Sequence, residues 1–118
     1  MPSERDDDLA LLDVMIEALD KVAAYTAGVS PEDFLQSTLI QDAVVMNFLV
    51  VGECANSLQI QTKNRAAEAP WPRIISLRNR LAHRYQSVDR LTIFGLAIND
   101  SAALRRTLDN LRQMLESD

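Results

Sequence analysis

The stretch from Ala43 to Val51 limits the possible fold of this chain more than any other, because it is apolar on almost every side. A helix that is apolar nearly all the way round has to be buried on several sides. The stretch is nine residues long and is interrupted by Asn47, well short of the roughly 20 residues that a membrane-spanning helix needs. We therefore expect a central helix in a small soluble bundle, covered by neighbouring helices or in part by a second subunit.

Elsewhere in the chain apolar residues recur at intervals of three and four, the spacing of amphipathic helices. Ser30 and Asp89 are suited to capping two of these helices, and Asn99-Asp100-Ser101 is expected to kink or interrupt the last one. No strand-type alternation competes with this pattern. The helices are expected over about residues 6–27, 30–36, 38–61, 72–85 and 89–116, with a polar loop from Lys63 to Pro70.

The predicted fold class is all-α, a four- or five-helix antiparallel bundle. With 118 residues the chain fits a single domain, residues 1–118, of which residues 1–5 are expected to be disordered. Cys54 is the only cysteine and lies in the apolar helix, where we expect it to be buried and unreactive. With a single histidine, no spacing typical of a metal site exists, so we expect no metal and no cofactor. The acidic N-terminus lacks the features of a secretory signal, and we expect a cytoplasmic protein.

Charge is distributed unevenly along the chain. The net charge is −5, which argues against a general nucleic-acid binder. Between Lys63 and Arg90, however, seven basic residues stand against two acidic ones. Such a basic island on an acidic body can hold a short piece of phosphate backbone, but charge alone slightly favours a merely solvated helix face, because surface arginines need no function.

Reactive side chains are concentrated between Arg78 and Tyr85. Arginine offers a planar fork of donors to a phosphate, and histidine exchanges protons near neutral pH. Arg78 and His83 are five positions apart, about 140° around a helix, and the length of the arginine lets both heads reach one groove. Asn79 can orient either of them, and we expect Arg80 and Arg84, an i, i+4 pair, to guide a substrate.

These parts suffice for attack of an RNA 2′-hydroxyl on its own phosphate, because the substrate supplies the nucleophile and no metal is needed. The reaction needs a base, an acid and a cation, whereas His83 is a single proton-transfer group. A symmetric dimer would supply a second His83 at the same groove. The alternative interpretation is that His83 stabilises the end of a helix and that the arginines only solubilise the surface.

The motif Arg, four residues, His, one residue, Tyr resembles the signature of the HepT-like toxins, which belong to the HEPN superfamily of helical ribonucleases. The resemblance covers roughly Leu9 to Leu115. Further segments that match in order and spacing are Gln41-Asp42-Ala43-Val44, Val51-Gly52-Glu53-Cys54-Ala55, Pro70-Trp71, Ile74-Ile75, Arg78-Asn79 and Val88-Asp89. One departure is Tyr85-Gln86-Ser87-Val88-Asp89, where relatives commonly carry an aromatic residue and a glycine after the tyrosine.

This resemblance implies a HEPN-like homodimer that acts as a metal-independent endoribonuclease toxin of a type VII, HepT/MntA-like toxin-antitoxin system. It implies Arg78 and His83 as the catalytic pair, with Asn79 in support. It also implies a partner, an MntA-like nucleotidyltransferase antitoxin, that neutralises the toxin by transferring AMP to Tyr85. Two competing hypotheses are a non-catalytic helical partner and the substrate-binding subunit of a minimal nucleotidyltransferase.

Overall fold

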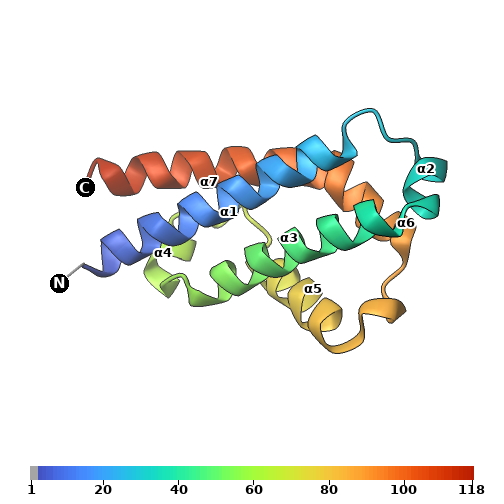
Figure 1. Cartoon of the computed structure of the whole chain (residues 1–118). Helices are drawn as coiled ribbons and strands as arrows, with labels where there is room; N and C mark the ends of the chain where they lie inside the picture. The colour runs from blue at the N-terminus through green and yellow to red at the C-terminus, as the bar shows by residue number, and fades with distance from the viewer. Residues whose placement is uncertain (1–2) are drawn as a thin grey trace.

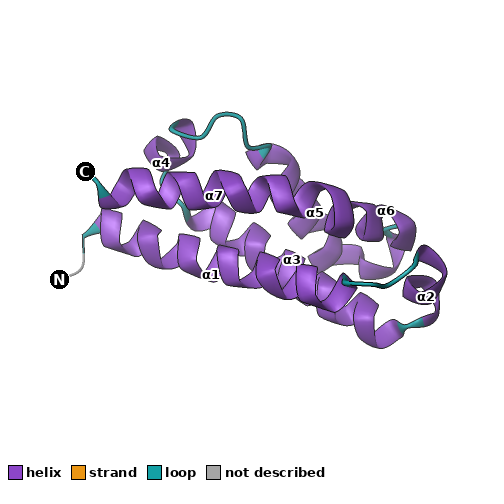
Figure 2. Cartoon of the chain, turned by 90° about the horizontal axis from the view of Figure 1, so that it is seen from above, coloured by secondary structure: helices purple, strands orange, loops and turns teal. Residues whose placement is uncertain are grey.

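The computed structural model describes residues 3–118, and all the regular structure in that range is helical (Figures 1 and 2). The prediction of an all-α fold is confirmed. A short 3₁₀ turn, Tyr85–Ser87, follows the fifth helix, and a π-helical turn, Leu96–Asp100, precedes the last. The α-helices are α1 (Glu4–Thr26), α2 (Pro31–Gln36), α3 (Thr38–Ser57), α4 (Ile60–Asn64), α5 (Trp71–Arg84), α6 (Arg90–Gly95) and α7 (Ser101–Glu116).

The four long helices, α1, α3, α5 and α7, form an elongated bundle (Figures 1 and 2). Helix α1 packs against α3 and α7, and α3 also packs against α5, so that the two ends of the chain lie together at one end of the bundle (Figure 1). Val44 and Val51 of α3 are buried, as expected for a central helix. By length and composition α3 could cross a membrane, but here it is the core helix.

One side of α3 remains uncovered. Leu39 is 79% exposed and Met46 is 62% exposed, and these two residues lie seven positions apart on one face of the helix. Neighbouring helices of the same chain therefore cover only part of the apolar surface that the sequence predicted to be buried.

The end of α3 differs from the prediction. The helix ends at Ser57, not at Gln61, and the separate turn α4 follows within the segment predicted to be helix and loop. The reason is a long-range contact: the buried carboxylate of Asp8 accepts hydrogen bonds from the Gln59 backbone N–H (3.4 Å), from Gln59 Nε2 (3.2 Å) and from the Thr62 hydroxyl. A partner in α1 thus fixes the break between α3 and α4.

Helix α1 begins within residues 1–5, the segment that the sequence predicted to be disordered. The predicted disorder of residues 1–5 falls in part on residues 1–2, which lie outside the described residues. Ser3 and Asp6 form a capping box, so that Glu4 and Arg5 already belong to the first turn of α1.

The other expected helix ends agree with the structure. Ser30 caps α2, and Asp89 caps α6 by accepting a hydrogen bond from the Thr92 backbone N–H at 3.3 Å. The interruption expected at Asn99-Asp100-Ser101 is present as the π-helical turn, and there the Ser101 hydroxyl donates to the Leu96 carbonyl at 3.0 Å.

Candidate functional site

Helix α5 carries the motif and presents two sides of different character. Leu81 is buried against the core, whereas Asn79 and His83 lie on the outer, solvent-exposed side. The spacing places Asn79 and His83 together because residues four apart share a helix face. The outer side of α5 is therefore open to a substrate.

The stem of Arg78 lies directly on Gly52 of α3. A Cβ atom built on Gly52 would lie 2.1 Å from Arg78 Cβ and 2.7 Å from Arg78 Cγ. Atoms in contact normally remain about 3.5–4 Å apart, so no residue other than glycine fits at position 52 without moving α5. The glycine thus brings α3 and α5 into close approach at the position of Arg78.

The head of Arg78 is held by two acceptors. Its Nη2 forms an ion pair with the Glu53 carboxylate, and its Nη1 donates to Asn79 Oδ1 at 2.8 Å. The side chains are 32% exposed for Arg78 and 59% exposed for Glu53, so water and solutes reach the pair. A pair this exposed contributes about 0–1 kcal/mol to stability, and its main effect is to orient the guanidinium.

His83 is exposed in the last turn of α5 and makes no side-chain hydrogen bond within residues 3–118. A protonated imidazole there interacts favourably with the carbonyl end of the helix. Arg78 and His83 are not bonded to one another, since Arg78 bonds to Glu53 and Asn79. A molecule that binds on the outer side of α5 could bridge the two groups.

Tyr85 lies just beyond α5 and is held from two sides. Its hydroxyl donates to Asp42 Oδ1, and the guanidinium carbon of Arg90 lies 4.3 Å from the centre of its ring. Arg90 also donates to the carbonyl of Val88 (2.8 Å) and to Gln41 Oε1 (3.2 Å), which fixes the turn that carries Tyr85. Burial, together with the hydrogen bond to Asp42, raises the pKa of the Tyr85 phenol, although the positive charge of Arg90 opposes this.

Two carboxylates of α3, Asp42 and Glu53, hold the two ends of the motif. They are eleven residues apart, which places them about 20° apart around the helix and roughly 16 Å apart along it. Sequence reasoning did not assign either of them a role. The sequence did contain one indication of a role: both residues lie in segments, Gln41–Val44 and Val51–Ala55, that match the family which the sequence resembles in order and spacing.

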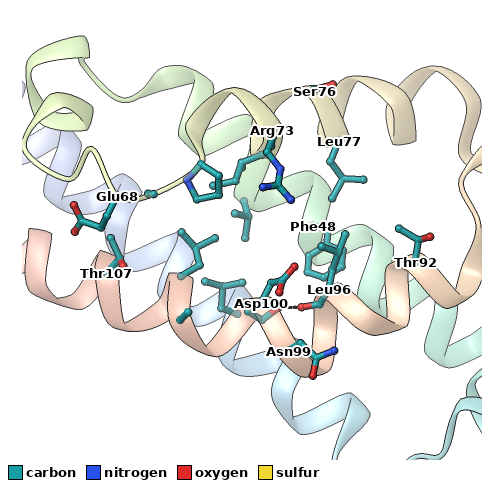
Figure 3. A pocket seen from close by; sticks show the side chains of 18 of the residues that line it. Phe48, Glu68, Arg73, Ser76, Leu77, Thr92, Leu96, Asn99, Asp100 and Thr107 are labelled. Carbon is teal, nitrogen blue, oxygen red and sulfur yellow. Dashed lines mark hydrogen bonds between the residues drawn. The ribbon is translucent and has the colours of Figure 1, made fainter.

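Arg80 lies on another side of α5 from Arg78, about 200° around the helix. It lines a groove of about 580 Å³ between α5 and the turn that precedes α7, with an apolar floor that includes Phe48 and Leu96 (Figure 3). The side chain of Arg73 reaches into this groove from α5, and Asp100 faces it from the π-helical turn (Figure 3). The groove is therefore separate from the Arg78–Glu53 site.

Three further expectations concern Arg84, Cys54 and metals. Arg84 is exposed at the end of α5 and forms no ion pair with the described residues. Cys54 is buried, and its pKa is raised by that burial and by the neighbouring charge of Glu53, which keeps the thiol protonated. Within residues 3–118, no three His, Cys, Asp or Glu side chains gather in a way that could hold a metal ion.

Comparison with known proteins gives a consistent match. A family model described as "Ribonuclease HepT-like" matches residues 15–111. "Probable ribonuclease HepT" of Thermococcus cleftensis is 26% identical over 102 residues, covering 86% of this chain and 93% of that protein. "Putative RNase MJ1380" of Methanocaldococcus jannaschii is 22% identical over 107 residues, covering 91% of this chain and 97% of the relative. No solved structure gives a significant match.

Proposed function

The chain belongs to the HepT-like ribonuclease family, and from this premise we propose that it is a metal-independent endoribonuclease that acts as the toxin of a HepT/MntA-like, type VII toxin-antitoxin system in the cytoplasm. The observation that supports the activity best is the outer side of α5. It combines an oriented guanidinium, Arg78, with an exposed imidazole, His83, on one helix.

The proposed reaction is attack of an RNA 2′-hydroxyl on the adjacent phosphate. Arg78 binds the phosphate and stabilises the charge that develops on it, and its planar fork of donors matches phosphate oxygens. His83 transfers protons, and Asn79 orients Arg78 through the hydrogen bond between their side chains. Deoxyribose lacks the 2′-hydroxyl, so DNA should not be cut.

The proposed substrate path extends along α5 beyond the cleavage site. Arg80 and Arg84 are cations without an ionic partner among residues 3–118, and we assign them to phosphates further along the RNA. Their separation from Arg78 around the helix suits contacts outside the cleaved nucleotide. Loss of either charge should lower affinity for all RNA sequences and reduce its salt dependence.

The proposed assembly is a homodimer formed over the outer side of α3. Leu39 and Met46 are large, exposed and apolar, and burying them would remove apolar surface from water. The same face lies next to the Arg78–Glu53 pair, so a two-fold axis there would bring two copies of the motif together. Light scattering of the wild type and of Met46→Glu tests this: a monomeric wild type would contradict the dimer.

The proposed control is transfer of AMP to the Tyr85 hydroxyl by a nucleotidyltransferase antitoxin. An AMP group would add negative charge and bulk beside the groove where RNA phosphate must bind. It would also remove the proton that the hydroxyl donates to Asp42. Co-expression with an MntA-like nucleotidyltransferase followed by intact-mass measurement tests the assignment, because the adduct must be absent from Tyr85→Phe.

The cleavage experiment uses purified protein, a mixed RNA substrate and a metal chelator. We expect cleavage by the wild type and a loss of about 100-fold or more in His83→Ala and Arg78→Ala. Equal residual cleavage by all three proteins would point to a contaminating nuclease. RNA binding without cleavage by the wild type would instead favour the second candidate, a non-catalytic helical partner of a nucleotidyltransferase.

A further inference from the structure

Cleavage through the 2′-hydroxyl moves two protons, and His83 is the only histidine in the chain. One group must accept the proton of the attacking hydroxyl, and another must protonate the departing 5′-oxygen. A single side chain does not readily serve both steps of one turnover. A second proton-transfer group in reach of the bound phosphate is therefore required, and either the second subunit of the proposed dimer or another side chain of this chain can supply it.

Glu53 is the titratable side chain that the structure joins to the phosphate-binding arginine. Its Oε2 accepts from Arg78 Nη2, whereas its Oε1 accepts no hydrogen bond from the described residues. The side chain is 59% exposed, so a ribose can approach it. A phosphate bound by the remaining donors of Arg78 would lie next to this carboxylate.

The backbone around Glu53 is fixed by packing. The preceding residue, Gly52, lies against the stem of Arg78, and the following residue, Cys54, is buried in the core. Glu53 therefore emerges at the contact line between α3 and α5. Arg78 is the charged group that faces it from α5, and the protonated thiol of Cys54 is its titratable neighbour within α3.

The other carboxylate on this face of α3 does not meet these requirements. Asp42 lies roughly 16 Å further along the helix, and it already accepts the hydrogen bond from the Tyr85 hydroxyl. It is thus committed to the opposite end of the motif. Glu53 alone of these two lies beside Arg78.

We propose that Glu53 is a catalytic residue, the general base that accepts the proton of the RNA 2′-hydroxyl while His83 acts as the general acid. The inference rests on the proposed ribonuclease function and adds a second proton-transfer group from the same chain. It assigns the pair of roles to Glu53 and His83 instead of to two copies of His83.

The step balances without a co-reactant. The 2′-oxygen forms a bond to phosphorus as its proton moves to the Glu53 carboxylate, and Arg78 stabilises the charged phosphate. The bond from phosphorus to the 5′-oxygen breaks, and His83 donates a proton to that oxygen. The products are a 2′,3′-cyclic phosphate and a 5′-hydroxyl, after which Glu53 loses its proton to water and His83 regains one.

The test compares Glu53→Gln with the wild type in single-turnover cleavage of RNA over a range of pH, with a chelator present. The glutamine keeps an oxygen that can accept from Arg78 but cannot take a proton at neutral pH. We expect the maximal rate to fall about 100-fold or more, with little change in RNA affinity. A general base makes the rate fall on the acidic side of the pH profile, and this fall should vanish in Glu53→Gln.

Two controls separate chemistry from folding and from general charge effects. Glu32→Gln removes one exposed carboxylate from α2 and should leave the rate unchanged. Glu53→Asp keeps a carboxylate on a shorter stem and should restore part of the rate lost in Glu53→Gln. The thermal midpoints of the three variants should lie close to that of the wild type, since these side chains are exposed.

The outcomes distinguish failure of this inference from failure of the proposed function. Wild-type cleavage that His83→Ala abolishes, but that Glu53→Gln leaves within about threefold, overturns the role of Glu53 alone. A faster Glu53→Gln also overturns it, because Glu53 would then only compete with phosphate for Arg78. A wild-type chain that does not cleave RNA overturns the ribonuclease function and this inference with it.

Discussion

Replacement of Gly52 by alanine is the most direct test of how the packing of α3 on α5 positions the motif. Glycine to alanine is normally favourable inside a helix, by about 0.5–1 kcal/mol. At Gly52, however, the new methyl would lie 2.1 Å from Arg78 Cβ and 3.4 Å from Arg78 Cα. The atoms it meets belong to the backbone and the first part of a side chain, so rotation of a flexible end cannot relieve the overlap.

The magnitude follows from the distance that has to be recovered. Separating the two carbons to a normal contact requires a movement of about 1.5 Å, which helix α5 must largely make as a unit. Overpacking of this kind costs about 1–3 kcal/mol, and the higher helix propensity of alanine offsets up to about 1 kcal/mol of it. We therefore expect Gly52→Ala to lower the free energy of unfolding by about 1–2 kcal/mol.

The same movement displaces Arg78 from Glu53. A misplacement of about 1 Å in a catalytic group can reduce the rate about 100-fold, so we expect cleavage to fall by about that factor even at temperatures where the variant is folded. Urea unfolding followed by circular dichroism gives the stability, and single-turnover RNA cleavage gives the rate.

The matched control is Gly95→Ala. Gly95 is also helical, but a Cβ atom there would meet nothing within 4 Å. This variant should be more stable than the wild type by about 0.5–1 kcal/mol and fully active. The reasoning is refuted if Gly52→Ala is as stable and active as the wild type, or if both substitutions change stability in the same direction.

Three further predictions concern Tyr85, Trp71 and Asp8. The raised pKa of Tyr85 favours the neutral phenol in the folded state, so its contribution to stability is present below its ordinary pKa of 10.0 and is lost as the pH rises above it. The phenolate absorbance of Tyr85 can be isolated by subtracting the spectrum of Tyr85→Phe. Asp42→Ala should make this absorbance appear at lower pH than in the wild type, and an unshifted titration curve would contradict the hydrogen bond. Trp71 is buried, and its indole donates to the carbonyls of Ala66 (3.0 Å) and Lys63 (3.2 Å). Trp71→Ala should therefore lower the free energy of unfolding, measured in urea, by about 3–5 kcal/mol, and a loss under 1 kcal/mol would argue against a stabilising role for these contacts. Asp8→Ala should cost about 1–3 kcal/mol because it leaves Gln59 and Thr62 without their partner, and calorimetry showing an unchanged midpoint would count against that contact.

Much of the fold could be predicted because helices are specified locally. Caps such as Ser30 and Asp89 act within three residues, and the apolar spacing that defines a helix face repeats every turn. The end of α3 could not be predicted in this way. It depends on the carboxylate of Asp8, which is 51 residues distant from Gln59 in the chain.

The same distinction between local and long-range contacts applies to the candidate site. The motif residues Arg78, Asn79 and His83 lie on one helix, so their spacing could indicate a shared outer side. The groups that hold the motif, Asp42 and Glu53, lie on another helix. Their contacts span 43 and 25 residues of sequence, which no local spacing encodes.

By itself the sequence determined the all-α class, the central place of α3 and the presence of an arginine, a histidine and a tyrosine on a single segment. Only the tertiary structure decided how these groups are held. Gly52 allows α5 to approach α3 so closely that Glu53 meets Arg78 and Asp42 meets Tyr85, whereas Arg80 turns into a different groove. The physical reason is that helix periodicity fixes the direction of each side chain around the axis of its own helix. The neighbours that the side chain meets depend on how that helix packs against another one.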